Sequence, residues 1–226
     1  MLVTSGGTAE PIDGVRVLTN ASTGRTGSDI AMRMVRSGHD VVLLRARNAA
    51  SAPSGCRDEV FASFADLDAA LARILSTGHF DAVIHAAAVS DFGVEEVLVG
   101  GTRSPPSHGK LDSDSAPVIR LRPNPKLVDG LRSRSLNPSI RVVAFKLTHG
   151  EDREGTLRAV DSLFAHSGAD LVVQNDLLER EGPDAFPSTI YFPGRTAPVR
   201  CATRRELADT LEHILAGVPA EAAVPA

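Results

Sequence analysis

Apolar residues alternate between two spacings along the chain, and the alternation predicts strands with helices between them. Short apolar runs predict strands at 1–4, 40–44, 81–87, 118–121, 141–145 and 169–174. Apolar residues at helical spacing predict helices over 23–37, 64–77 and 151–167, with a further one opening at Pro125. Strands of four to seven residues separated by helices are typical of βαβ units. The sequence therefore predicts the α/β class, with a doubly wound, Rossmann-like parallel sheet.

Capping signals set the expected helix ends. Ser22 is the predicted N-cap of the first helix, and Asn124 precedes a helix whose first residue is Pro125. The segment 203–206 reads as a capping box, so a last helix is expected from there to Gly217. These signals leave no break long enough to divide the chain, and a single domain over 1–226 is predicted.

Two regions depart from the alternation. Residues 93–117 show no periodicity and contain paired glycines and prolines, so we expect a long flap that is functional or disordered. Residues 189–192 and 198–201 predict a small C-terminal β-hairpin, and 218–226 predict a frayed tail.

Composition and charge limit the classes of partner that the chain is expected to bind. The chain has 24 basic and 28 acidic residues, a net charge of −4, which argues against nucleic acid or an anionic membrane as the main partner. Cys56 and Cys201 show no metal-ligand spacing and predict free thiols. No apolar run has the length of a signal or membrane segment, so a cytoplasmic protein is expected.

Two glycine-rich clusters are candidates for phosphate binding. Gly6 and Gly7 follow the first strand, and Ser22, Thr23 and Gly24 open the first predicted helix. Glycine lets backbone amides approach a phosphate, and a helix N-terminus favours an anion. The spacing matches neither the dinucleotide fingerprint nor the P-loop, so phosphate binding and plain turn chemistry both remain open.

Several segments together resemble the phosphopantothenate–cysteine ligase (phosphopantothenoylcysteine synthetase) family. The resemblance covers residue 2 to about 176 in the family's order. In many bacteria this domain is fused behind a flavin decarboxylase, and this chain resembles the stand-alone branch. It is carried by VTSGGTAEPIDGVR at 3–16, TNASTG at 19–24, AAAVSDF at 86–92, GKL at 109–111, PNPK at 123–126, FKL at 145–147 and VQND at 173–176.

The resemblance implies an amide-forming, nucleotide-dependent reaction in coenzyme A biosynthesis. The carboxylate of 4′-phosphopantothenate attacks the α-phosphate of CTP, or of ATP, and the amine of cysteine then captures the acyl nucleotide. Mg²⁺ would arrive with the nucleotide, no flavin is expected, and family members are typically homodimers.

The resemblance also assigns the site. Asn20 would handle the acyl nucleotide, Lys110 on the flap would stabilise charge at the α-phosphate, and Asp91 would bind the base or ribose. Asn20 and Asp91 are also common in turns and caps, Lys110 in solvated loops, and Phe145 in cores. The remaining expected nucleotide contacts are Gly6, Gly7, Ser22, Thr23, Gly24, His85, Ala86, Ala87, Pro125, Lys126, Leu127, Val128 and Phe145.

Departures and alternatives remain. The family often places lysines on the helix after the FKL strand, but the predicted helix at 151–167 has none, so Arg153, Arg158, Arg25 or Mg²⁺ would neutralise phosphate. His85, His108 and His149 fit no ligand motif, so no protein metal site is predicted. A Rossmann-type oxidoreductase would need a tyrosine–lysine pair, and the chain offers Tyr191 and Arg195 instead. The third hypothesis is a non-catalytic nucleotide-binding paralogue.

Overall fold

A computed structural model describes residues 1–106, 109–112, 114, 116–180, 182, 185–194 and 197–217. The predictions that concern His108, Arg195 and the tail at 218–226 lie outside these described residues.

The main sheet confirms the Rossmann-like prediction. Within the described residues it has eight strands in the order β13-β12-β11-β10-β6-β1-β4-β5. The six strands from β11 to β5 pair in parallel, and β12 and β13 continue the sheet as an antiparallel hairpin. Their bounds are β1 Leu2–Ser5, β4 Val41–Ala46, β5 Cys56–Phe61, β6 Ala82–His85, β10 Arg141–Thr148, β11 Leu171–Asp176, β12 Ala185–Tyr191 and β13 Val199–Thr203.

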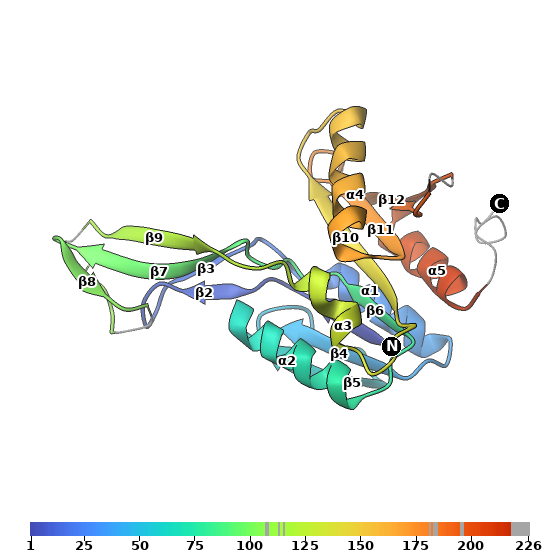
Figure 1. Cartoon of the computed structure of the whole chain (residues 1–226), viewed down its shortest axis with the longest axis horizontal. Helices are drawn as coiled ribbons and strands as arrows, with labels where there is room; N and C mark the ends of the chain where they lie inside the picture. The colour runs from blue at the N-terminus through green and yellow to red at the C-terminus, as the bar shows by residue number, and fades with distance from the viewer. Residues whose placement is uncertain are drawn as a thin grey trace.

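Helices cover both faces of this sheet (Figure 1). The helices α1 (Arg25–Arg36) and α5 (Arg204–Leu215) pack on one face. The other face carries α2 (Phe64–Thr77), the 3-10 helix η1 (Leu127–Gly130), α3 (Leu131–Arg134) and α4 (Arg153–Ser167). Alternate strand residues enter the two cores, as Leu2 and Val3 do on β1. None of the helices in the described residues combines the length and apolar character that crossing a bilayer requires.

A second β layer projects from the body as an arm (Figure 1). The name refers to an antiparallel sheet of β7 (Phe92–Val99), β8 (Thr102–Ser104) and β9 (Val118–Pro123), with the hairpin β2 (Ala9–Pro11) and β3 (Val17–Thr19) beside it. A small core of Val94, Val97 and Leu111 joins Ile12 of the hairpin to this sheet. The expected flap at 93–117 therefore contains regular structure in β7 and β8, so the expectation that it lacks regular elements was wrong, whereas its role as a functional flap stays a prediction. Charged residues interrupt its alternation, while Gly100 and Gly101 form the β7–β8 turn at φ 56° and 82°.

Two local predictions need correction, and two elements were missed. Gly24 in the left-handed conformation, not Ser22, is the N-cap of α1, and no side chain caps it. Asn124 does not cap a helix; it is buried and its amide donates to the Ser90 carbonyl. The hairpin β2–β3 and the charged edge strand β5 were not predicted. The cap at Thr203 is confirmed, since its hydroxyl accepts from the Glu206 amide at 3.2 Å.

Candidate functional site

The candidate site lies at the point where the order of the parallel strands reverses, between β1 and β6. From β1 the parallel strands run outward through β4 and β5 on one side and through β6, β10 and β11 on the other. Ligands of open α/β sheets bind in the crevice outside the carboxyl ends of the strands at such a switch point. By this rule the expected crevice begins at Gly6 and Ala86, which directly follow β1 and β6.

The two glycine clusters meet at this crevice. A Cβ on Gly6, at φ 82°, would lie 2.6 Å from the Cβ of Ala46. A Cβ on Gly24, at φ 72°, would lie 3.2 Å from the Gly6 backbone nitrogen. A Cβ on Gly7 would lie 2.9 Å from the Asn20 carbonyl oxygen. Glycine is therefore required at these positions for the two turns to come into contact. Their contact leaves backbone amides at the N-terminus of α1.

His85 forms part of the floor and not an open contact. Its Nδ1 lies 2.9 Å from the Thr4 hydroxyl, which accepts from the Ala87 amide at 3.1 Å. Which of the two atoms donates in the Thr4–His85 hydrogen bond depends on the tautomer of the ring. Burial lowers the pKa of His85 to about 4, so the ring is neutral at neutral pH. Its role is to hold the segment at Ala86 and Ala87.

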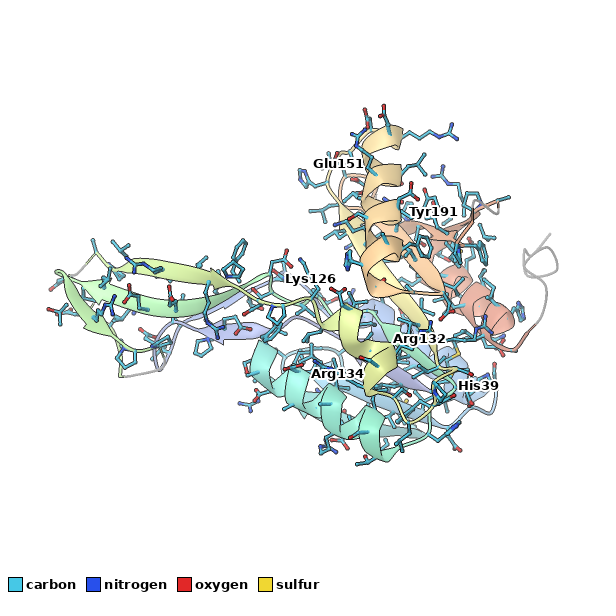
Figure 2. The ribbon with its side chains drawn as sticks, in the orientation of Figure 1. His39, Lys126, Arg132, Arg134, Glu151 and Tyr191 are labelled. Carbon is cyan, nitrogen blue, oxygen red and sulfur yellow. The ribbon has the colours of Figure 1, made fainter. Side chains whose placement is uncertain are left out.

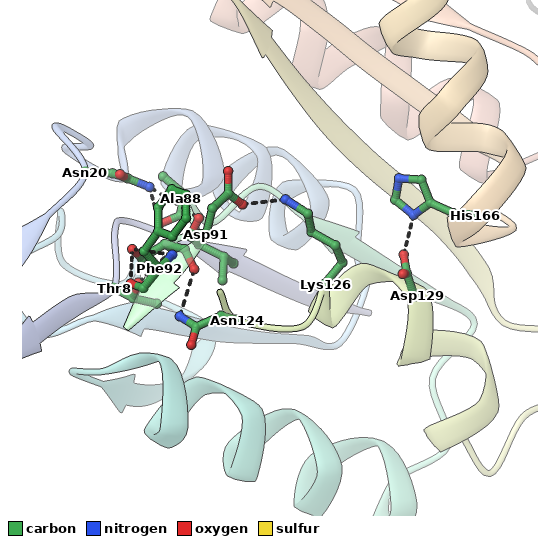
Figure 3. Close-up of polar contacts among 11 residues, drawn as sticks. Thr8, Asn20, Ala88, Asp91, Phe92, Asn124, Lys126, Asp129 and His166 are labelled. Carbon is green, nitrogen blue, oxygen red and sulfur yellow. Dashed lines mark hydrogen bonds and ion pairs between the residues drawn. The ribbon is translucent and has the colours of Figure 1, made fainter. Parts of the chain in front are cut away.

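Asn20 and Asp91 lie on the loops that border the crevice (Figure 3). The Asn20 amide nitrogen donates to the carbonyls of Ala88 and Val89, each at 3.3 Å. The Asp91 carboxylate forms an ion pair of 2.5 Å with the Lys126 ammonium. Both side chains of this pair are more than half exposed, so the pair is open to a ligand. The predicted site residues Asn20, Asp91 and Lys126 therefore lie together. Asp91 belongs to the loop 88–91, and the other two contact it.

The other predicted contacts divide between crevice and core. Ser22 donates its backbone amide to the Asn20 carbonyl at 2.8 Å, and Thr23 stays exposed beside it. Pro125 is also exposed, whereas Leu127 is buried in the main core and Val128 packs against it. Phe145 packs against the core under α1 and α5, which favours the core alternative for its ring.

A hollow of about 360 Å³ opens at the carboxyl end of β10. Lys146, Thr148, His149, Glu151 and Arg158 are among its lining residues. Figure 2 shows Lys126 where the arm meets the body and Glu151 at the outer end of α4. Arg158 therefore lies where the sequence predicts a cation, although it also pairs with Glu154 at 2.7 Å. Lys146 was not among the predicted contacts, although it stands in the FKL segment at 145–147 that carries part of the resemblance.

The structure does not bring Lys110 to the crevice of its own chain. Lys110 is exposed, and its neighbour Gly109 accepts from the Gly14 amide at 2.6 Å in the turn between β2 and β3. Asn20 lies past the opposite end of that hairpin, because Thr19 pairs with Ala9 and the turn begins beyond Pro11. Lys110 and Asn20 are thus separated by the length of the hairpin.

Sequence reasoning missed the residues that shape the loop 88–91. The Thr8 hydroxyl accepts from the Ser90 amide at 3.0 Å, and the Asn124 backbone amide donates to the Asp91 carbonyl at 2.8 Å. Their types are common in turns, so nothing but the family motifs could have marked them. Among the described residues no three His, Cys, Asp or Glu side chains gather as a metal site.

The strand order and the glycine turns at the switch point define a Rossmann-like α/β protein. The chain belongs to the family described as the DNA/pantothenate metabolism flavoprotein C-terminal domain, whose model matches residues 1–216.

Relatives are bifunctional proteins of coenzyme A biosynthesis named CoaBC. The protein from Thermococcus kodakarensis is 33% identical over 217 residues, which are 93% of this chain and 49% of that protein. The protein from Mycobacterium tuberculosis (strain H37Rv) is 31% identical over 183 residues, which are 77% of this chain and 41% of that protein. The chain thus spans about half the length of these curated relatives or less.

Solved structures show the same fold. A DNA/pantothenate metabolism flavoprotein from Streptococcus pneumoniae has a TM-score of 0.84 at 23% identity, covering 96% of this chain and 97% of that one. A variant of Cab2 in complex with phosphopantothenate-cysteine has a TM-score of 0.71 at 19% identity, covering 96% and 87%.

Proposed function

We propose that this protein is a phosphopantothenate–cysteine ligase that acts in coenzyme A biosynthesis. The observation that carries the proposal is the meeting of both glycine turns with Asn20 and the loop of Asp91 at one switch-point crevice. The bifunctional relatives of coenzyme A biosynthesis and the Cab2 complex with phosphopantothenate-cysteine support it. The alternative of an oxidoreductase gains no support, because Tyr191 lies on the antiparallel strand β12 and packs against the core.

The proposed reaction has two steps. The carboxylate of 4′-phosphopantothenate attacks the α-phosphate of CTP, or of ATP, and pyrophosphate leaves. The cysteine amine then attacks the acyl carbon, and the nucleoside monophosphate leaves. Backbone amides at Gly6 and Gly7 face developing phosphate charge, as is favourable at a glycine turn beside a helix N-terminus.

Asn20 suits the second step. Because its amide nitrogen is held by two carbonyls, its side-chain oxygen has a fixed direction. That oxygen accepts no hydrogen bond within the described part of the chain, so it is open to orient the attacking amine. Positioning of this kind lowers the barrier by removing the freedom of the reactants in advance.

The pair of Asp91 and Lys126 suits the nucleotide. In the proposed complex Asp91 accepts from the ribose or base, and Lys126 turns toward the phosphates. Lys146, Arg158 and Arg25 supply further positive charge. Mg²⁺ would arrive on the nucleotide phosphates, with Asp91 as an exposed carboxylate nearby and no further protein ligands assigned. The proposal assigns the domain no flavin of its own.

We further propose a homodimer formed through the arm. The arm exposes several large apolar side chains, a feature that marks interaction surfaces. The exposed fractions are 68% for Val15, 50% for Val17, 48% for Phe92, 62% for Val118 and 41% for Leu121. A dimer would also let Lys110, which lies far along the arm, reach the crevice of the second copy.

Pyrophosphate release tests the proposal. The purified protein is incubated with 4′-phosphopantothenate, cysteine, Mg²⁺ and either CTP or ATP. We expect sustained release with cysteine, and about one equivalent per site without it, because the acyl nucleotide then accumulates. If neither nucleotide gives release above a mixture without phosphopantothenate, the proposed function is wrong.

A further inference from the structure

Lys110 stands on a segment that is anchored to the β2–β3 turn by one buried carboxylate. The Asp13 side chain is only 1% exposed. It accepts from the backbone amides of Val15 and Arg16 at 2.8 and 2.6 Å, which closes its own turn. It also accepts from the Leu111 amide at 3.1 Å, across 98 positions of sequence.

Further contacts hold the residues on both sides of Lys110. Arg16 donates its guanidinium to Asp13 at 2.6 Å and to the Leu111 carbonyl at 3.4 Å. The Gly14 amide donates to the Gly109 carbonyl, and a Cβ on Gly14 would lie 2.7 Å from that oxygen. Leu111 itself is 8% exposed in the small core of the arm.

The anchor makes the neighbouring side chains of Leu111 and Lys110 point in different directions. Leu111 points into the arm while Lys110 is exposed, and no hydrogen bond or ion pair holds Lys110 among the described residues. Burial alone would raise the pKa of Asp13, but the hydrogen bonds from Leu111, Arg16 and Val15 outweigh it and lower the pKa to about 2. The carboxylate is therefore charged at every pH at which the enzyme would be assayed.

We propose that Asp13, assisted by Arg16, is the positioning residue for Lys110. This inference rests on the proposed function, in which Lys110 acts on the α-phosphate. A mobile ammonium would lose rotational and segmental freedom on reaching a phosphate, and a preset backbone removes part of that loss. Asp13 acts through the peptide bonds of 109–111 and touches no substrate.

A double-mutant cycle separates positioning from general stability. Asp13→Asn keeps the size of the side chain but loses the charge. We expect it to lower kcat for pyrophosphate release by roughly tenfold to a hundredfold, with less change in the KM for phosphopantothenate. In a Lys110→Ala background the same substitution should cost less than about twofold, because a residue that acts only through Lys110 has nothing left to position.

Glu96→Gln is the matched control. Glu96 is another nearly buried carboxylate of the arm, with its side chain 10% exposed, and it pairs with Arg103 at 2.7 Å and Arg120 at 2.6 Å. Its substitution should loosen the arm and change kcat by the same factor with or without Lys110. If Asp13→Asn behaves as Glu96→Gln does, or if Lys110→Ala retains full activity, the positioning role is overturned.

Hydrogen exchange tests the anchor without any turnover. The Leu111 amide should be protected in the wild type and exchange at least tenfold faster in Asp13→Asn, while amides in α2 keep their rates. Unchanged exchange at Leu111 would overturn the proposal. A wild type without ligase activity would instead refute the proposed function and leave the anchor to be judged by exchange alone. If Asp13→Asn fails to fold, Arg16→Gln removes two of the same contacts and is expected to change exchange and kcat in the same direction.

Discussion

The contact between the two glycine turns gives a prediction with a built-in control. Gly6 and Gly38 have nearly equal backbone angles, at φ 82° and 86°. An alanine Cβ at Gly6 would lie 2.6 Å from the Cβ of Ala46 and 2.7 Å from that of Ala49, whereas at Gly38 nothing lies within 4 Å. Gly6→Ala and Gly38→Ala therefore share the backbone term and differ in the steric one.

The magnitudes follow from these contacts. A non-glycine residue in the left-handed region costs about 1–2 kcal/mol, and both variants share that cost. Forcing a methyl group into a packed site costs about 1–3 kcal/mol more, and this applies to Gly6→Ala alone. Gly38→Ala should thus lower the free energy of unfolding by about 1–2 kcal/mol, and Gly6→Ala by about 2–5 kcal/mol.

Urea unfolding followed by circular dichroism measures both changes. Ala49→Gly should relieve part of the cost of Gly6→Ala, because the Ala49 Cβ lies 2.7 Å from the Cβ position at Gly6, while the contact with Ala46 remains. Gly6→Ala should also weaken nucleotide binding measured by calorimetry, since the backbone amides must move, whereas Gly38→Ala should not. Equal destabilisation by the two substitutions would show that the turns do not touch as the structure has them.

Three further predictions concern the crevice. Lys110→Ala should lower kcat for pyrophosphate release by about a hundredfold to a thousandfold, with an unchanged unfolding midpoint, because it removes charge stabilisation at the α-phosphate alone; a change below threefold would refute this. The buried His85 should make stability depend on pH. Its pKa is about 4 in the folded chain and near 6.5 in the unfolded chain, so between these two pH values the unfolded chain binds more protons. Stability should fall as the pH drops from 6.5 to 4, by up to about 3 kcal/mol, and unfolding curves of His85→Gln should lose that slope. Asp91→Asn should raise the KM for the nucleotide at least tenfold and leave that for cysteine within twofold, as steady-state kinetics would show; equal changes in both would contradict its assignment.

The fold was largely predictable because its strong signals are local. The parallel strands are short runs of branched apolar residues, and α2 begins and ends where the spacing of Leu67, Leu71 and Ile74 predicts. The arm was predictable only in part. The apolar run at 118–121 predicted strand β9, but not its place in an antiparallel sheet, and β7 mixes Glu95 and Glu96 with its apolar positions, so it shows no strict alternation.

The sequence motifs named candidate site residues, but little of their geometry followed from the motifs. The motifs include Asn20, Asp91 and Lys126, which the structure brings together around the loop 88–91, and the roles of these residues stay predictions. They could not reveal that Leu127 is buried in the core, or that Lys110 belongs to a segment docked on another hairpin. Those facts depend on pairings between residues roughly a hundred positions apart, which no local pattern encodes.

The hairpin β2–β3 explains how such distant motifs act together. It starts just after the glycine turn at Gly6 and Gly7, and its return strand delivers Asn20 to the loop 88–91. Its outer turn carries Asp13, which holds the segment of Lys110. One short stretch of chain thus connects the glycine turn at Gly6 and Gly7, the side chain of Asn20 and the anchor of the Lys110 segment. A strong resemblance over residues 3–24 is therefore expected from the physics of the site, because a change of register anywhere in the hairpin would move all three at once.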